Sequence, residues 1–97
     1  MRYNIVFAPH AVQDLKRLPA RNRTLIRDAV EKHLRFEPDK ISQSRIKRLQ
    51  GIRHPQYRLR VGEIRVFYDI AAEAVEVLAI IQKSDAADWL AEMGEAE

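Results

Sequence analysis

The chain lacks cysteine and has only three glycines, four prolines and one tryptophan among its 97 residues. Without cysteine there is no disulfide framework and no thiolate metal site, and nothing requires an oxidising compartment. No apolar run is long enough to span a bilayer, and the N-terminal stretch has no long apolar segment followed by a small-residue cleavage site. We therefore expect a single domain over residues 1–97 with one hydrophobic core, cytoplasmic and without a membrane partner.

Acidic residues are almost absent from the middle of the chain. Between residues 40 and 68 the only carboxylate is Glu63, whereas residues 69 to 97 contain a single basic residue, Lys83. The basic residues of the middle part are Lys40, Arg45, Lys47, Arg48, Arg53, Arg58, Arg60 and Arg65. Positive charge concentrated on one strand pair is typical of nucleic-acid binding, although an ordinary solvated surface would have the same composition.

Residues 57 to 68 predict two strands joined by a tight turn at Gly62 and Glu63. Glycine at the first central position is the signature of a type II′ hairpin turn. The facing pairs would be Tyr57 with Tyr68, Arg58 with Phe67, Leu59 with Val66, Arg60 with Arg65, and Val61 with Ile64. Because side chains alternate along a strand, one face of the hairpin would be apolar and the other would carry three guanidinium groups.

Arg60 and Arg65 would lie directly opposite each other, about 5 Å apart between Cβ atoms, and such a like-charge pair destabilises an empty fold. A bound anion would offset the repulsion, and guanidinium forks match phosphate oxygens in both geometry and charge. The alternative is that these arginines extend into solvent or form surface ion pairs with Glu63, Asp69 or Glu76.

The remaining pattern predicts an α+β fold. Strands are expected over residues 2–8, 46–49, 57–61, 64–70 and 75–81, and helices over 9–17, 20–36 and from about residue 84 onward. An N-terminal strand and a helical hairpin would pack on an antiparallel sheet of about four strands, with a short C-terminal helix. His33 falls on the apolar stripe of the second helix and is expected in the core, and the arginine face would be the uncovered side of the sheet.

Several segments resemble the RelE/ParE superfamily of toxin–antitoxin toxins. They are Phe7-Ala-Pro-His-Ala11, Asp14-Leu-Lys-Arg-Leu-Pro19, Leu49-Gln-Gly51, Tyr57-Arg-Leu-Arg-Val-Gly62 and Ile64-Arg-Val-Phe-Tyr-Asp-Ile70. The RelE-like branch, which the arginines favour, implies a metal-independent, ribosome-dependent mRNA endonuclease that inhibits translation and uses the 2′-hydroxyl beside the scissile phosphate as nucleophile. The resemblance also implies that Arg58 and Arg60 occupy basic central-strand positions and that Arg65 is the transition-state arginine.

The C-terminal part departs from the superfamily pattern. Where the superfamily has a His-Arg pair and then a tyrosine that can transfer protons, this chain has Gln82-Lys83 and later Trp89. Lys83 is the candidate replacement for the arginine and a possible acid, with Asp85 or Asp88 as alternative bases. Trp89 is either an RNA-stacking residue or a packing residue. The candidate RNA-contacting residues are Lys47, Arg48, Arg53, His54 and Trp89, and His54 is also a proton-transfer candidate.

Two further functions remain open from the sequence. One is a ParE-like DNA gyrase inhibitor without nuclease chemistry, which the missing tyrosine favours. The other is a catalytically weak RNA-binding relative that acts through its antitoxin complex. The expected partners are a cognate antitoxin, mRNA and the ribosome, with operator DNA for the complex. No cofactor is expected, because the sequence has no metal-ligand spacing and no Gly-rich phosphate loop.

Overall fold

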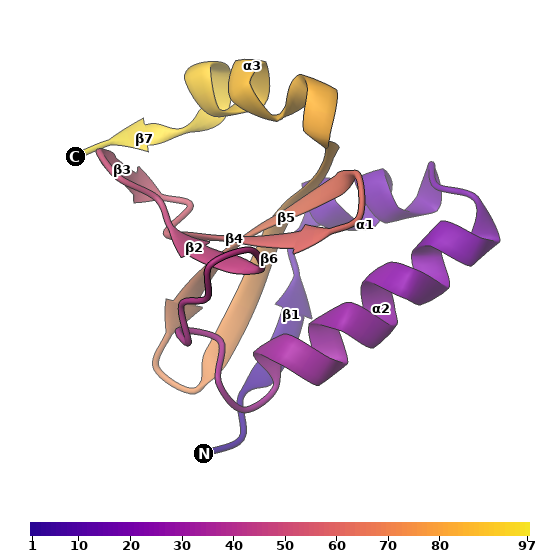
Figure 1. The fold of residues 1–97 in the computed structure, drawn as a ribbon, viewed down its shortest axis with the longest axis horizontal. Coiled ribbons are helices and arrows are strands. Elements are labelled where there is room, and N and C mark those ends of the chain that lie inside the picture. The colour runs from indigo at the N-terminus through magenta and orange to yellow at the C-terminus, as the bar shows by residue number, and fades with distance from the viewer.

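We describe the protein from a computed structural model that covers all 97 residues (Figure 1). The elements are β1 (Asn4–Phe7), α1 (Pro9–Lys16), α2 (Ala20–Leu34), β2 (Ile46–Arg48), β3 (Ile52–His54), β4 (Tyr57–Val61), β5 (Ile64–Ala71), β6 (Ala74–Gln82), α3 (Lys83–Met93) and β7 (Glu95–Ala96). The predicted α+β class and the predicted order of the main elements are confirmed. No helix has both the length and the apolar content needed to cross a membrane.

The main sheet has five strands in the order β1-β6-β5-β4-β2. Strands β2, β4, β5 and β6 form the expected antiparallel meander, but β1 pairs in parallel with β6. The backbone N–H of Asn4 donates to Glu73, and that of Ala8 donates to Val77, so the parallel pairing is anchored at both ends. The expected antiparallel sheet of about four strands is therefore present, but the N-terminal strand, which was expected to pack on this sheet, joins it as a fifth strand in parallel with β6.

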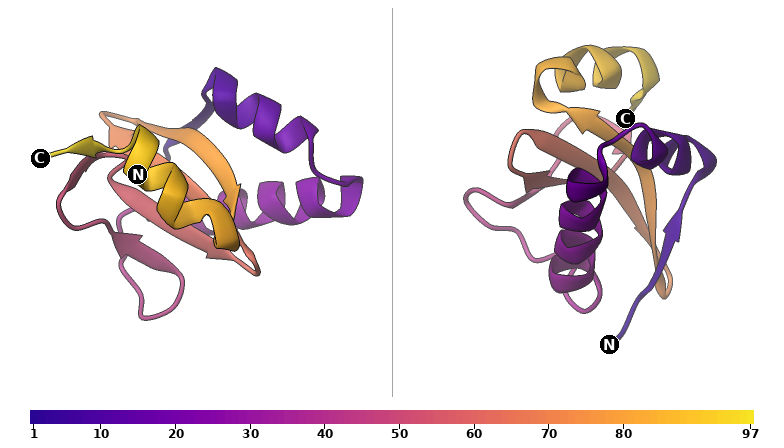
Figure 2. Two further views of the ribbon diagram at one scale, coloured as in Figure 1. Left: turned by 90° about the horizontal axis from the view of Figure 1, so that it is seen from above. Right: turned by 90° about the vertical axis from the view of Figure 1, so that its right-hand side faces the viewer.

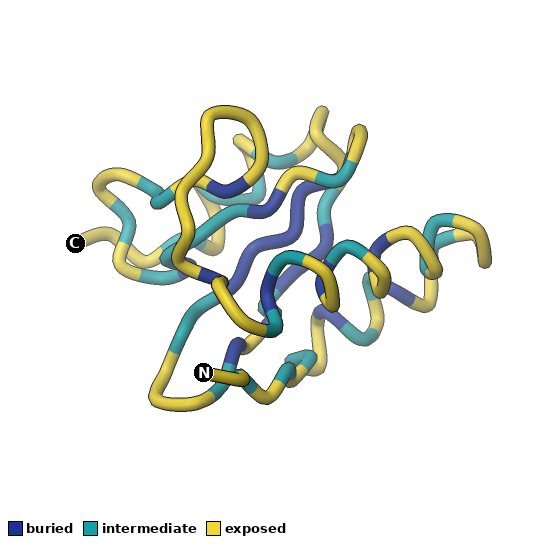
Figure 3. Tube along the Cα trace, turned by 60° about the horizontal axis from the view of Figure 1, so that its bottom comes forward, coloured by how far each residue is buried: buried dark blue, intermediate teal, exposed yellow.

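The hydrophobic core lies between one face of this sheet and the two N-terminal helices, where buried residues follow the central strands and the inner helix surfaces (Figure 3). The core residues from the helices are Ala11, Leu15, Ile26, Val30 and Leu34, and those from the strands include Leu59, Val66, Tyr68, Val75 and Val77. Pro9 opens α1, where a missing N–H has no cost, and Pro19 separates α1 from α2. We call the side of the sheet that faces α2 the core face.

His33 does not belong to this core. Its side chain is only partly buried, and its Nε2 lies 3.1 Å from Nη1 of Arg45, a distance at which the guanidinium donates to the neutral imidazole. Partial burial, followed by the charges of Arg45 and Lys32, lowers the pKa of His33. The expectation of a core histidine was wrong because the buried stripe of α2 is narrower than the sequence pattern implied.

The opposite side of the sheet, here called the second face, is partly covered by α3 and not open as expected. Helices α3 and α2 lie on opposite sides of the sheet (Figure 2). The ring of Trp89 stacks on Phe67 with centroids 4.9 Å apart and planes 15° from parallel. Beyond α3, β7 pairs with β3 in a separate two-stranded sheet, which the sequence did not predict. No residue of α3 is buried, so this cover is attached lightly.

Candidate functional site

The arginine hairpin forms as predicted. All five facing pairs of β4 and β5 have the expected register, including Arg60 with Arg65 and Arg58 with Phe67. Gly62 has a φ of +58°, and Glu63 is not among the residues with positive φ, which agrees with glycine at the first central position of a type II′ turn. Alternation then places Arg58, Arg60 and Arg65 together on the second face.

The three arginines differ in exposure. Arg60 is exposed and Arg58 is partly buried, whereas only 8% of Arg65 is exposed. Nη1 of Arg65 donates to the carbonyl oxygens of Gly62 at 2.9 Å and Ile64 at 3.1 Å. These two bonds hold the Arg65 guanidinium against the turn, so its position is set before any ligand arrives.

The three positive charges influence one another. Desolvation by burial lowers the pKa of Arg58, and the nearby charges of Arg65 and Arg60 lower it further. The three arginines therefore lie near enough for their charges to interact, although arginine stays protonated in proteins. The like-charge pair of Arg60 and Arg65 that the sequence predicted is present in the structure.

No carboxylate of the chain neutralises these arginines. The ion pairs of the structure are Arg17 with Asp14, Arg35 with Glu31, Lys40 with Glu37, and His54 with Asp69. The alternative in which the arginines pair with Glu63, Asp69 or Glu76 is therefore wrong. In addition, Nε of Arg58 is buried and has no hydrogen-bond partner. A buried donor without an acceptor costs about 1–3 kcal/mol.

The other predicted basic contacts are only partly brought to this site. Lys47 is exposed and is the register partner of Arg58, so it extends the arginine group across β2. Arg48 pairs with Tyr57 and faces the core side, where its Nη1 donates to Gln56 O at 2.7 Å and its guanidinium lies 5.3 Å from the Tyr57 ring centroid. The structure therefore places Arg48 away from the second face. Arg53 is exposed on β3, in the smaller sheet.

The two C-terminal candidates occupy different positions. Lys83 is the exposed first residue of α3, and its backbone N–H donates to Glu63 O at 2.7 Å beside the hairpin turn. Trp89 packs on Phe67, the register partner of Arg58, and thereby holds α3 over the second face. Packing therefore accounts for the position of Trp89, because one face of its ring is stacked on Phe67.

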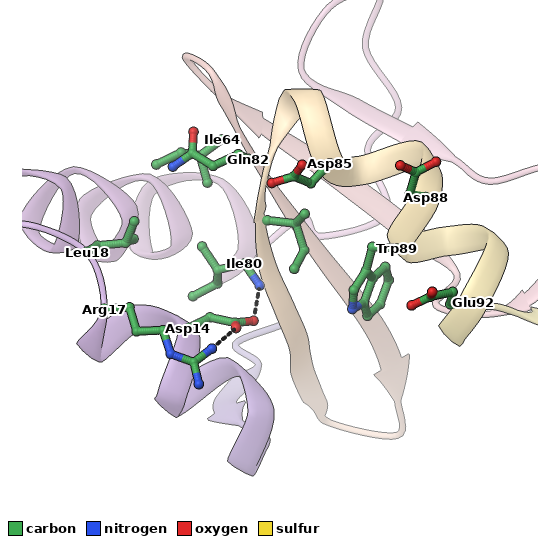
Figure 4. A pocket seen from close by; sticks show the side chains of 11 residues that line it. Asp14, Arg17, Leu18, Ile64, Ile80, Gln82, Asp85, Asp88, Trp89 and Glu92 are labelled. Carbon is green, nitrogen blue, oxygen red and sulfur yellow. Dashed lines mark hydrogen bonds and ion pairs between the residues drawn. The ribbon is translucent and has the colours of Figure 1, made fainter.

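Two cavities adjoin Trp89. The first, of about 450 Å³, lies between α1, the end of β6 and α3 (Figure 4). Its carboxylates are Asp14, Asp85, Asp88 and Glu92. Asp14 is already engaged, because Oδ2 accepts the Ile80 N–H at 2.9 Å. Asp85 and Asp88 line this cavity and form no ion pair with any residue of the arginine group.

The second cavity, of about 680 Å³, contains a pair of residues that the sequence analysis did not connect. Nδ1 of His54 lies 2.7 Å from Oδ2 of Asp69, and both residues line the cavity. Oδ1 of Asp69 also accepts the backbone N–H of Gln56 at 2.7 Å. The hairpin register would have placed Asp69 beside the start of β4, but only the path of the preceding loop brings His54 to it. No group of three or more histidine or acidic side chains is arranged to hold a metal ion.

Comparison with known proteins gives a consistent result for the fold. Residues 5–87 match the family described as ParE toxin of type II toxin–antitoxin system, parDE. No curated protein matches the chain. Among solved structures, a chain of the toxin–antitoxin complex RelBE2 from Mycobacterium tuberculosis is similar, with 24% identity and a TM-score of 0.69, over 84% of this chain and 99% of that one.

Two further solved structures have slightly lower TM-scores. A chain of the RelB-RelE antitoxin–toxin complex from Methanococcus jannaschii has 25% identity and a TM-score of 0.65, over 87% of this chain and 96% of that one. A chain of the RelE-RelB complex from Pyrococcus horikoshii OT3 has 24% identity and a TM-score of 0.63, with 86% and 97% covered. The helical hairpin, the mixed sheet and the short C-terminal helix therefore define a RelE-like fold.

The family match covers most of the chain, and it identifies the family as well as the fold. This protein belongs to the ParE toxin family of type II toxin–antitoxin systems, within the RelE/ParE superfamily.

Proposed function

We propose that this toxin is a ribosome-dependent mRNA endonuclease that binds the phosphates of its substrate with Arg58, Arg60 and Arg65. The observation that carries the proposal is the placement of these three arginines on one face of the sheet without a carboxylate partner.

The chemistry of RNA cleavage explains why such a group would be useful. In-line attack of a 2′-oxygen on the neighbouring phosphate increases the negative charge on the equatorial phosphoryl oxygens. Cations that are fixed in advance stabilise this charge more in the transition state than in the ground state. Arg65 is fixed by two backbone carbonyls, and Arg60 is exposed beside it, so the pair is ready to receive a phosphoryl group.

The proposed partners follow from the same surface. The similar solved structures are complexes of a toxin with its antitoxin. For this chain we propose a cognate antitoxin with an acidic or amphipathic segment that covers the arginine group and so blocks RNA. The free toxin would meet mRNA on the ribosome, and the toxin–antitoxin complex would bind operator DNA.

One observation favours a second function. The description of the matching family names the parDE system. In addition, Trp89 packs on Phe67 and supplies no proton-transfer group. A ParE-like toxin would inhibit DNA gyrase and would need no acid or base of its own. The remaining alternative is a catalytically weak RNA-binding toxin. Such a toxin would use the same arginine group to bind RNA as the proposed nuclease does.

A paired assay distinguishes these functions. Purified toxin is added to ribosomes programmed with a defined mRNA, and cleavage is mapped by primer extension, while the same preparation is added to a gyrase supercoiling reaction. We expect cleavage that depends on the ribosome and normal supercoiling. Intact mRNA together with inhibited supercoiling would reject the nuclease and establish the second function.

A further inference from the structure

The second cavity holds an imidazole arranged for proton transfer. Asp69 fixes the His54 ring through the 2.7 Å contact between Oδ2 and Nδ1, and Asp69 is itself held by the Gln56 N–H. Nε2 of His54 makes no hydrogen bond within the chain, and 42% of the side chain is exposed, whereas only 13% of Asp69 is exposed. In such a pair the carboxylate orients the ring and stabilises the imidazolium, and the outer nitrogen is free to accept a proton.

This pair lies on the same face as the arginine group. Residues alternate along β5, so Arg65, Phe67 and Asp69 point to the same side of the sheet. Arg58 is the register partner of Phe67, which makes Asp69 its diagonal neighbour, at about 7–8 Å. A single phosphodiester and its ribose can span that distance, with the phosphate on Arg58 and the sugar towards His54.

We propose that His54, oriented by Asp69, is the general base of the RNA cleavage reaction, in the place of the tyrosine that this chain lacks. The inference rests on the proposed endonuclease function. Nε2 accepts the proton of the 2′-hydroxyl while the 2′-oxygen forms a bond to phosphorus. The bond between phosphorus and the 5′-oxygen breaks, and that oxygen takes a proton from water. The products are a 2′,3′-cyclic phosphate and a 5′-hydroxyl end, and the imidazolium returns its proton to solvent.

Charged groups from several elements surround the imidazole. The cavity walls bring His10 from α1, Asp69 from β5, Glu76 from β6 and Glu95 from β7 to the same space, and Trp89 and Met93 of α3 add an apolar wall. Three carboxylates against one other histidine make the local charge negative. The same charge repels phosphate, so the phosphate stays on the arginine side and the ribose hydroxyl faces the cavity.

A structural role for the pair would have different consequences. His54 and Asp69 join the end of β3 to β5, and a contact with a purely structural role would affect stability without affecting the pH dependence of cleavage. We therefore test the base role by single-turnover cleavage on programmed ribosomes across pH 5 to 9, with His54→Gln as the variant and His33→Gln as the matched control. Thermal unfolding and ribosome binding are measured on the same proteins.

For a general base we expect His54→Gln to lower the cleavage rate by about 10²–10⁴-fold and to remove the limb of the pH profile that an imidazole produces. Ribosome binding should stay within about twofold, and His33→Gln should behave as the wild type. Asp69→Asn should also lower the rate, because an amide does not stabilise the imidazolium. A second variant, His54→Ala, opens space beside the cavity, and added imidazole should restore part of its cleavage activity.

The outcomes separate the two proposals. If folded His54→Gln cleaves at the wild-type rate with the wild-type pH profile, while arginine variants lose activity, the base assignment is wrong and the nuclease function stands. If His54→Gln does not fold, imidazole rescue of folded His54→Ala supports the base, and absence of rescue overturns it. If the wild-type toxin cleaves no mRNA, the proposed function fails and the base role fails with it.

Discussion

The β4–β5 hairpin and the α3–β7 segment border the same face of the sheet, but the protein holds them in different ways. Strand β5 has five consecutive buried residues, from Ile64 to Tyr68, whereas α3 has none. The hairpin is bonded along its length to β2 and β6, while the contacts of the α3–β7 segment include the Trp89–Phe67 stack, the bond from Lys83 N–H to Glu63 O and the pairing of β7 with β3. The three arginines therefore lie on strands that are well buried, whereas the adjacent helix α3 has no buried residue.

The largest expected effect concerns the chemistry of the hairpin. Substituting Arg60→Ala together with Arg65→Ala should lower mRNA cleavage by about 10³-fold or more, because each preorganised donor at a developing anion contributes about 10²–10³-fold. Single-turnover cleavage on programmed ribosomes measures the effect. Arg21→Ala is the control, since Arg21 is an exposed arginine on α2. A double variant with the wild-type rate would show that the site is elsewhere.

The second prediction compares the stability of the two regions directly. Leu59 is fully buried in β4, so Leu59→Ala should reduce the free energy of unfolding by about 2–5 kcal/mol. Leu90 of α3 is only partly buried, and Leu90→Ala should reduce it by less than about 1 kcal/mol. Urea unfolding of both variants measures the difference. Equal losses would mean that α3 belongs to the cooperative core.

The third prediction concerns the pH dependence of stability that the buried Tyr68 of the hairpin causes. Tyr68 is buried and donates to Pro38 O at 2.6 Å, and burial, then Tyr57 and Asp39, raise its pKa strongly. The unfolded chain therefore releases this proton first, so the free energy of unfolding falls as pH rises above about 10, by up to about 1.4 kcal/mol per pH unit. Comparison with Tyr68→Phe, which lacks the ionisable group, should isolate this slope. Parallel pH curves for the two proteins would contradict the assignment.

The smallest expected effect is a gain in stability. Arg60→Ala removes the like charge opposite Arg65 and should increase the free energy of unfolding by up to about 1 kcal/mol. Arg65→Ala should not give this gain, because its buried side chain also bonds two carbonyl groups. Thermal unfolding of both single variants tests the asymmetry. A less stable Arg60→Ala would indicate that this arginine has an attractive partner.

Much of the fold could be predicted because local signals agreed with the final contacts. Gly62 fixed the turn, and alternation from that turn gave every facing pair of the hairpin. The parallel pairing of β1 with β6 and the pairing of β7 with β3 join segments that are distant in the sequence. The spacing of apolar residues within a segment does not indicate such pairings. The covered second face was missed for the same reason, since only the packed structure shows that Trp89 reaches Phe67.

The candidate site was predictable to a similar degree. The arginine group followed from strand alternation, but Arg48 was assigned to it because a strand of three residues gives too little pattern to fix which side chains share a face. The His54–Asp69 contact joins residues 15 apart in the sequence, and it depends on how the loop before β4 folds back. Sequence reasoning could nominate His54 but could not identify the carboxylate that orients it.

The most direct test of the central claim is a structure of the toxin on a ribosome programmed with mRNA that carries a 2′-O-methyl group at the cleavage position, which blocks in-line attack. We predict that backbone phosphates lie within hydrogen-bond distance of the arginine group, with the phosphate beside the methylated ribose on Arg58 and that ribose towards His54. A bound toxin whose second face contacts no phosphate, with the mRNA held by another surface, would contradict the account.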